Sequence, residues 1–199
     1  MRGYFRKTTL NPDKNLQSYV IGLALGDGNL SNPNERATRL RITCDNKYPL
    51  LMQRIFNSLK LLFPENKAQI ISRNLYGCSD ISIYSNHLEK LLGWEASHGS
   101  KFIQNISVPK WIKENNGYKI NCLRGLLETD GSIYTDRKYK TVIFTTIVPK
   151  LAEDFYEMIT SLRFEPHLYK INGKNNIEYH IRLSKKVSEF LNLVKPEKE

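Results

Sequence analysis

Two acidic residues, each followed by glycine, occupy matching places in two similar stretches of the chain. Tyr19–Gly28 reads YVIGLALGDG, and Cys122–Gly131 reads CLRGLLETDG. When the final Asp-Gly pairs are aligned, the second stretch lies 130 − 27 = 103 positions after the first. Asp27 and Asp130 are therefore candidates for a pair of carboxylates, which in proteins suit hard cations such as Mg²⁺.

The residues before each acid predict a helix. The first stretch is apolar on nearly all sides, which is typical of a buried helix, and glycine commonly follows a helix end. Small residues four positions apart form a smooth stripe on each helix: Gly22 with Gly26, and Gly125 with Thr129. Such stripes allow two helix backbones to approach closely. We therefore expect the helices to pack side by side and to bring the two acids together at one end.

The two stretches resemble the nine-residue motif of the LAGLIDADG homing endonucleases. Val20–Gly28 and Leu123–Gly131 match that motif at its Gly, Leu and final Asp-Gly positions. Leu25 and Glu128 stand where the motif has its first Asp, a position that is not a metal ligand in the family.

The resemblance implies a set of site residues. The last acid of each motif, Asp27 or Asp130, binds the catalytic metal in this family. The metal is expected to be Mg²⁺, with Mn²⁺ or Ca²⁺ able to occupy the same site. The backbone carbonyls of Gly26 and Thr129 are expected as extra ligands. Family members often add a central lysine, and two candidates for this catalytic base lie near the second motif in sequence, Lys138 and Lys140.

The repeat extends beyond the motifs. Pro49–Leu62 and Pro149–Leu162 predict matching amphipathic helices, and Arg39–Thr43 and Tyr139–Thr145 predict strands. Residues 29–38 are interpreted as a turn or long loop, because they contain Asn-Pro-Asn. A repeat with a period near 100 indicates a duplicated domain rather than a solenoid.

We predict an α+β fold made of two α-β-β-α-β-β-α halves. A pseudo-twofold axis relates the halves along the paired motif helices, and two antiparallel sheets form a saddle for DNA. The expected boundaries are residues 1–95 for the first half, 96–117 for a connector and 118–199 for the second half.

The composition favours a partner rich in phosphate. Lys and Arg number 30 against 20 Asp and Glu, which gives a net charge of +10. Three cysteines without a CxxC pattern indicate neither a disulfide framework nor a zinc ribbon. No apolar run approaches membrane length, and no signal-peptide core begins the chain. We expect an intracellular protein that lies wherever the host DNA is, in the cytoplasm of a prokaryote or in an organelle.

The strand faces that point away from the core are expected to bind double-stranded DNA. Cations there would hold phosphates, while hydroxyl, amide and aromatic groups could reach base edges. The predicted DNA contacts are Arg36, Arg39, Arg41, Thr43, Arg73, Asn74, Tyr76, Ser82, Tyr84, Tyr134, Tyr139, Thr141, Thr145, Lys170, Lys174, His180 and Arg182.

The leading functional hypothesis is a monomeric, site-specific endonuclease that cuts both DNA strands at a long, nearly non-palindromic site by metal-dependent phosphodiester hydrolysis. Two motifs in one chain already build the interface that single-motif relatives make by dimerising. The alternatives are an RNA maturase that binds intron RNA, a cleavage-inactive DNA-binding protein on the same fold, and the nuclease domain of an intein.

Overall fold

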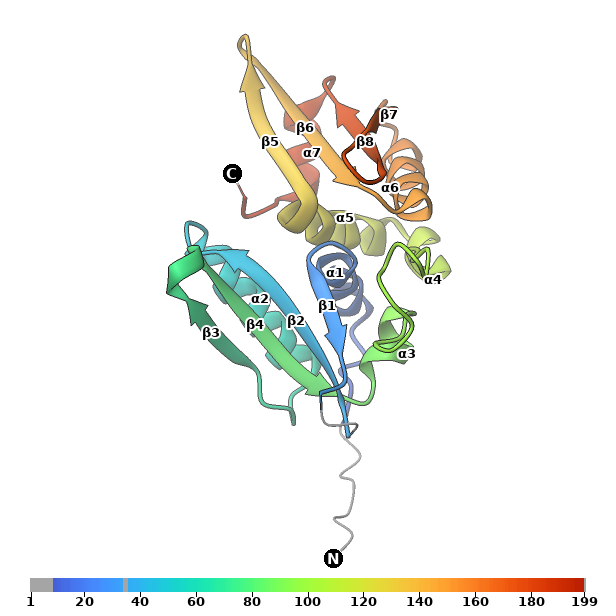
Figure 1. Ribbon diagram of the computed structural model, residues 1–199. Helices are drawn as coiled ribbons and strands as arrows, with labels where there is room; N and C mark the ends of the chain where they lie inside the picture. Colours follow the sequence, from blue (N-terminus) through green and yellow to red (C-terminus); the bar gives the residue numbers. More distant parts are fainter. Residues whose placement is uncertain (1–8, 34–35, 199) are drawn as a thin grey trace, which may run out of the picture.

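The computed structural model describes residues 9–33 and 36–198, and the described elements fall into two similar halves (Figure 1). The first half comprises α1 (Lys14–Leu25), β1 (Gly28–Ser31), β2 (Thr38–Asp45), α2 (Pro49–Leu62), β3 (Gln69–Arg73), the 3₁₀ turn η1 (Asn74–Tyr76), β4 (Cys78–Ser85) and α3 (Leu88–Leu92). The second comprises α5 (Asn116–Asp130), β5 (Gly131–Asp136), β6 (Tyr139–Thr146), α6 (Pro149–Ser161), β7 (His167–Asn172), β8 (Ile177–Leu183) and α7 (Val187–Val194). The connector contains α4 (Lys110–Lys113). The predicted α-β-β-α-β-β-α order is confirmed for both halves.

Each half contains one four-stranded antiparallel sheet. The strand orders are β1-β2-β4-β3 and β5-β6-β8-β7, so the two sheets share one topology. Apolar partners pair on the core side of the central strands: Leu40 with Ile83, Ile42 with Ile81, Val142 with Leu183, and Phe144 with Ile181. All eight of these side chains are buried. Six of them alternate with polar residues, as a half-buried strand predicts, whereas Ile143 lies between Val142 and Phe144.

The first strand of the first sheet departs from the sequence prediction. Residues 29–38 were expected to form only a turn or loop, but Gly28–Ser31 forms β1 and pairs with β2. The strand has four residues, and Leu30 is its only large apolar side chain. A strand this short shows no detectable alternation, and pairing with the longer β2 stabilises it.

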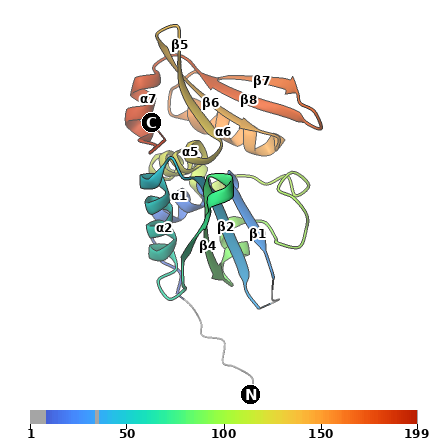
Figure 2. The same cartoon turned by 60° about the vertical axis from the view of Figure 1, so that its left-hand side comes forward.

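The motif helices α1 and α5 lie side by side at the centre, with one sheet on each side of the pair (Figures 1 and 2). A Cβ atom added at Gly22 would overlap the carbonyl oxygen of Cys122 on the facing helix. A Cβ atom at Gly125 would lie 2.5 Å from both the Leu23 nitrogen and the Tyr19 carbonyl oxygen. Both neighbours are backbone and cannot rotate away, so the predicted close approach at these glycines is confirmed.

The remaining helices cover one face of each sheet. The buried residues of α2 are Leu51, Ile55, Ser58, Leu59 and Leu62, which lie on one side of the helix at helical spacing. α6 packs in the same way on β6 and β8. Figure 2 shows α2 and α7 along one side of the molecule, with α1 and α5 between the two halves. The strands β3 and β7 are exposed along their whole length. In the described part of the chain, no helix is long and apolar enough to cross a membrane.

Candidate active site

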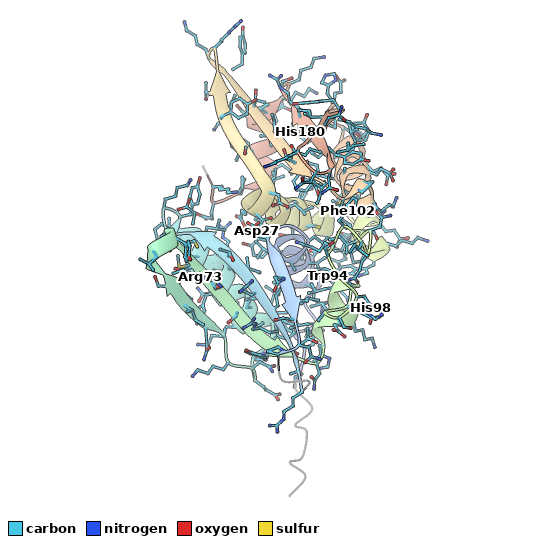
Figure 3. All side chains as sticks on the ribbon, in the orientation of Figure 1. Asp27, Arg73, Trp94, His98, Phe102 and His180 are labelled. Atoms are coloured by element: carbon cyan, nitrogen blue, oxygen red, sulfur yellow. The ribbon has the colours of Figure 1, made fainter. Side chains whose placement is uncertain are left out.

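The two motif acids meet at one end of the paired helices. α1 ends at Leu25, so Asp27 lies just beyond the helix, whereas Asp130 is the last residue of α5. Burial raises the pKa of Asp130 to about 7, and the neighbouring Asp27 carboxylate adds to this rise. Figure 3 shows Asp27 between the two sheets, with Arg73 on the first sheet and His180 on the second. The chain therefore places a close pair of carboxylates where the two halves meet.

A lysine from the connector reaches the end of α1. The Lys101 ammonium donates to the backbone carbonyl oxygens of Leu25 at 2.9 Å and Ala24 at 3.3 Å, and also contacts that of Gly26. These carbonyls form the negative end of the helix dipole, where a cation is stabilising. Burial lowers the pKa of Lys101, while Asp130 and Asp27 oppose that change.

A second lysine takes the equivalent place at the end of α5. The Lys198 ammonium donates to the carbonyl oxygen of Gly131 at 3.1 Å and contacts that of Thr129. Burial lowers its pKa, and Asp27 and Asp130 again oppose the change. Two lysines therefore lie beside two acids, one lysine for each motif helix.

Sequence reasoning missed both of these lysines and proposed two others. Lys138 lies in the turn between β5 and β6, and Lys140 pairs with Thr135 near the far end of that hairpin. Thr135 lies 135 − 130 = 5 positions beyond Asp130, which is roughly 17 Å of strand at about 3.4 Å per residue. The structure therefore does not bring Lys138 and Lys140 together with the acids.

A signal for Lys101 and Lys198 does exist in the repeat. Lys101 lies 101 − 27 = 74 positions after its motif acid, and Lys198 lies 198 − 130 = 68 positions after the other. Each follows the last helix of its own half, so the pair occupies matching places in the duplicated unit.

The donor set suits a hard cation. Mg²⁺ is usually held by one or two carboxylates together with water and substrate phosphate oxygens, and Asp27 and Asp130 supply such a pair. Within the described ranges, no group of three or more His, Cys, Asp or Glu side chains offers a larger metal cluster. The Gly26 and Thr129 carbonyls, expected as further ligands, accept hydrogen bonds from the two lysines.

A separate cavity borders each acid. Asp27 and Lys198 line one of about 520 Å³ between β2, α2 and the start of β5. Asp130 and Lys101 line another of about 420 Å³ beside Phe102. Each cavity is thus lined by the motif acid of one half and by the lysine that follows the last helix of the other half.

The uncovered face of the first sheet carries a charged network. Asp80 on β4 is only 4% exposed. It accepts a hydrogen bond from the Thr43 hydroxyl at 2.8 Å and pairs with an Arg73 nitrogen at 2.5 Å and an Arg41 nitrogen at 3.9 Å. One buried carboxylate therefore orients two of the predicted DNA-contacting arginines.

The second sheet has a different group at the matching place. Thr145 pairs with His180 across β6 and β8, just as Thr43 pairs with Asp80 across β2 and β4. The His180 ring lies 3.3 Å from the Thr145 hydroxyl and 3.2 Å from a Glu178 carboxylate oxygen. The two halves therefore present different charge and hydrogen-bonding groups on otherwise similar faces.

The other predicted contacts divide by exposure. Those exposed are Arg36, Tyr76, Tyr84, Tyr134, Tyr139, Lys170 and Lys174, and those partly buried are Arg39 and Arg182. Two predicted contacts are buried, Ser82 at 5% and Thr141 at 1% exposure, because neighbouring side chains cover these short residues. Both side chains are nearly inaccessible to solvent in this structure, and their contact with DNA stays a prediction. Asn74 lies in η1, and its side chain falls outside the described part of the molecule.

Comparison with known protein families agrees with the repeat seen in the fold. Residues 117–195 match the model of a LAGLIDADG-like domain, and residues 16–75 match that of the WhiA LAGLIDADG-like domain. The chain carries two LAGLIDADG-like domains. Each of these matches includes one motif helix and its acid.

Solved structures of two kinds share this LAGLIDADG-like fold. I-DmoI in complex with DNA and Mn matches with a TM-score of 0.68 and 18% identity, over 91% of this chain and 96% of that one. The N-terminal LAGLIDADG domain of DUF199/WhiA matches with a TM-score of 0.64 and 14% identity, over 98% of this chain and 96% of that one. At such identities the likeness establishes the fold alone.

One curated relative also matches. The replication factor C small subunit of Methanocaldococcus jannaschii is 25% identical over 195 residues. The match covers 83% of this chain, which spans only 11% of that relative's length.

Proposed function

We propose that the protein is a homing endonuclease, a monomeric enzyme that cuts both strands of DNA at a specific long site by metal-dependent hydrolysis. The observation that carries this proposal is the acid pair. Asp27 and Asp130 lie together at the ends of two LAGLIDADG-like motif helices, and a partly buried lysine contacts the backbone at each helix end. A pair of packed helices needs no such arrangement for stability, because burial and mutual repulsion both disfavour two ionised carboxylates.

The two acids would hold Mg²⁺ in this enzyme. I-DmoI, named as a homing endonuclease, has been solved with DNA in the presence of Mn, Ca or Mg. Between Asp27 and Asp130, a bound metal would supply an activated water and would stabilise the leaving oxygen. The two carboxylates would hold it between the halves, and its charge would relieve their mutual repulsion.

Lys101 and Lys198 would supply positive charge beside the reacting phosphate. Lys101 and Lys198 are partly buried, and a positive charge in such a setting acts more strongly on a phosphate than it would in water. Each lines a cavity with one acid. Two such openings, one on each side of the acid pair, suit the two strands of a duplex that lies across both sheets.

The uncovered sheet faces provide the binding surface. Arg41, Arg73 and the exposed lysines of β7 and its following loop carry positive charge toward phosphate, as the net charge of +10 leads one to expect. Asp80 in one half and His180 in the other give the faces different chemistry. A nearly non-palindromic site follows from this difference.

A DNA-binding protein without cleavage activity is the second candidate. The WhiA-type matches favour it, because they associate this fold with proteins whose names include no nuclease. A shared fold does not by itself carry a shared reaction.

One experiment separates the two functions. The protein is incubated with a library of randomised DNA duplexes, first in EDTA to collect bound sequences and then in Mg²⁺ to collect cut ends. A nuclease yields cut ends at one sequence in Mg²⁺ and none in EDTA. A binding protein yields an enriched sequence that remains intact in both, and this result would remove the endonuclease proposal.

A further inference from the structure

The segment that carries Lys198 is held by an ion-pair cluster outside the acid pair. We call residues 194–198 the strap. They run from the last residue of α7 back to the end of α5 (Figure 1). Lys195 has a left-handed backbone with φ of 53°, which turns the chain there. The Lys198 side chain reaches its place beside the acids only if the strap lies along this path.

Glu128 is the centre of the cluster. Its carboxylate is fully buried and accepts three hydrogen bonds from three different elements. The Tyr19 hydroxyl of α1 donates at 2.6 Å, the Arg54 guanidinium of α2 at 3.0 Å, and the Glu197 backbone amide of the strap at 2.8 Å. One carboxylate thus joins both halves of the protein to the strap.

Arg54 contacts the strap at two further points. Its guanidinium pairs with the Glu197 carboxylate and donates to the Lys195 carbonyl oxygen at 3.4 Å. Arg124 of α5 adds a bond at 2.5 Å to the carbonyl oxygen of Val194. Hydrogen bonds to charged groups are the stronger kind, so the strap is fixed at three successive places before Lys198.

The two motifs differ at the position of Glu128, and the two lysines differ in how their segments are held. Glu128 occupies the motif position at which the first motif has Leu25. Lys101, at the end of the first helix, lies in a connector loop that bonds to itself, with Ile106 donating to the Lys101 carbonyl oxygen and Gln104 to the Gly99 carbonyl oxygen. The second motif, whose lysine lies on the strap, has an acidic side chain at this position, and the first motif has none.

We propose that Glu128 and Arg54 are positioning residues that fix the strap and so deliver Lys198 to the paired acids. Neither needs to touch DNA or metal. The consequence for cleavage rests on the proposed function, whereas the placement of the strap does not. A purely structural role for the cluster is the competing explanation, and it makes different predictions.

The first test is a double-mutant cycle on cleavage of the selected DNA site. Arg54→Gln removes both strap contacts from a side chain that is 32% exposed. We expect it and Lys198→Met each to slow cleavage about 10- to 100-fold, the range seen when outer-shell partners are lost. The double variant should be no slower than Lys198→Met alone, since both changes remove the same action. Losses that multiply in the double variant would overturn the proposal.

Lys113→Gln is the matched control. Lys113 also pairs with a buried carboxylate, that of Asp154, and its side chain is 26% exposed. It has no contact with the strap among the described interactions. This variant should lower stability without slowing cleavage by the factor seen for Arg54→Gln. An equal loss of cleavage would show that any broken buried ion pair has this effect, and the proposal would fail.

The second test needs no activity. Hydrogen exchange of the Glu197 and Lys198 amides is compared between the wild-type protein and Arg54→Gln. We expect faster exchange in the strap with unchanged protection in α5. Unchanged exchange in the strap would overturn the proposal even if the protein cuts DNA. If no DNA is cut at all, the proposed function fails while this measurement still decides the role of the cluster.

Discussion

Replacing Gly22 by alanine should weaken the central helix pair. The added Cβ would overlap the Cys122 carbonyl oxygen and lie 3.0 Å from its carbon and 3.1 Å from its Cα atom. All three atoms are backbone of α5, so relief requires the helices to move apart. Overpacking of this kind costs about 1–3 kcal/mol, and the severity of the overlap places this site at the upper end. Alanine recovers about 1 kcal/mol of helix propensity, which leaves a net loss of about 2 kcal/mol.

Urea denaturation measures this difference directly. The midpoint for Gly22→Ala should fall while the slope stays unchanged. Gly117→Ala is the matched control on α5, where the added Cβ would meet only side-chain oxygens, at 3.2 and 3.5 Å. That variant should be close to neutral. A Gly22→Ala protein that is as stable as the wild type would refute the reasoning, because the helices would then not need the glycine to approach.

Three further predictions concern charge. In EDTA the acid pair should make the protein less stable as pH rises from 5 to 8. The pKa of Asp130 is raised to about 7 in the folded state from its ordinary value near 3.8, so between these values the folded state keeps a proton that the unfolded state releases. The stabilisation by this proton is lost as the pH rises through 7. Melting temperatures of the wild type and Asp130→Asn check it, and parallel pH profiles would count against it. Lys101→Met should slow cleavage at least about tenfold, because a charge beside the reacting phosphate is lost, while DNA affinity stays within about twofold, because the binding surface is large. Single-turnover cleavage and fluorescence anisotropy measure the two effects. Normal cleavage would remove Lys101 from the site. Affinity for DNA should fall steeply between 50 and 200 mM salt, by about a thousandfold if six phosphates are contacted, and a nearly flat titration would contradict a phosphate-binding surface.

The features predictable from the sequence were those that local pattern encodes. Gly22 and Gly125 occupy the same position in the two motifs, and each faces the backbone of the partner helix. The repeated glycine therefore predicted the close contact. The acids follow the same logic, since helix ends that pack together must bring their terminal residues together. The second sheet was equally readable in β8, because Ile181 and Leu183 alternate with polar neighbours.

Features that depend on long-range placement were not predictable. Lys101 and Lys198 reach the acids from segments some 70 residues away in sequence, and no periodicity marks them; only a comparison of the two halves shows that each follows the last helix of its half. The role of Asp80 depends on the register between β2 and β4, which fixes its neighbours across the sheet. Thr141 has a suitable side chain on the expected face, but its burial depends on neighbours that strand alternation does not reveal.

The central claim is that Asp27 and Asp130 together hold the metal that cuts DNA. The most direct measurement is single-turnover cleavage of the selected duplex in Mg²⁺ by the wild type, Asp27→Asn and Asp130→Asn, with binding measured in parallel. Asparagine keeps the shape of the side chain and removes its charge, so both variants should bind the duplex and neither should cut it. Cleavage of both strands at near wild-type rate by either variant would show that its acid does not hold the metal, and the account of the site would be wrong.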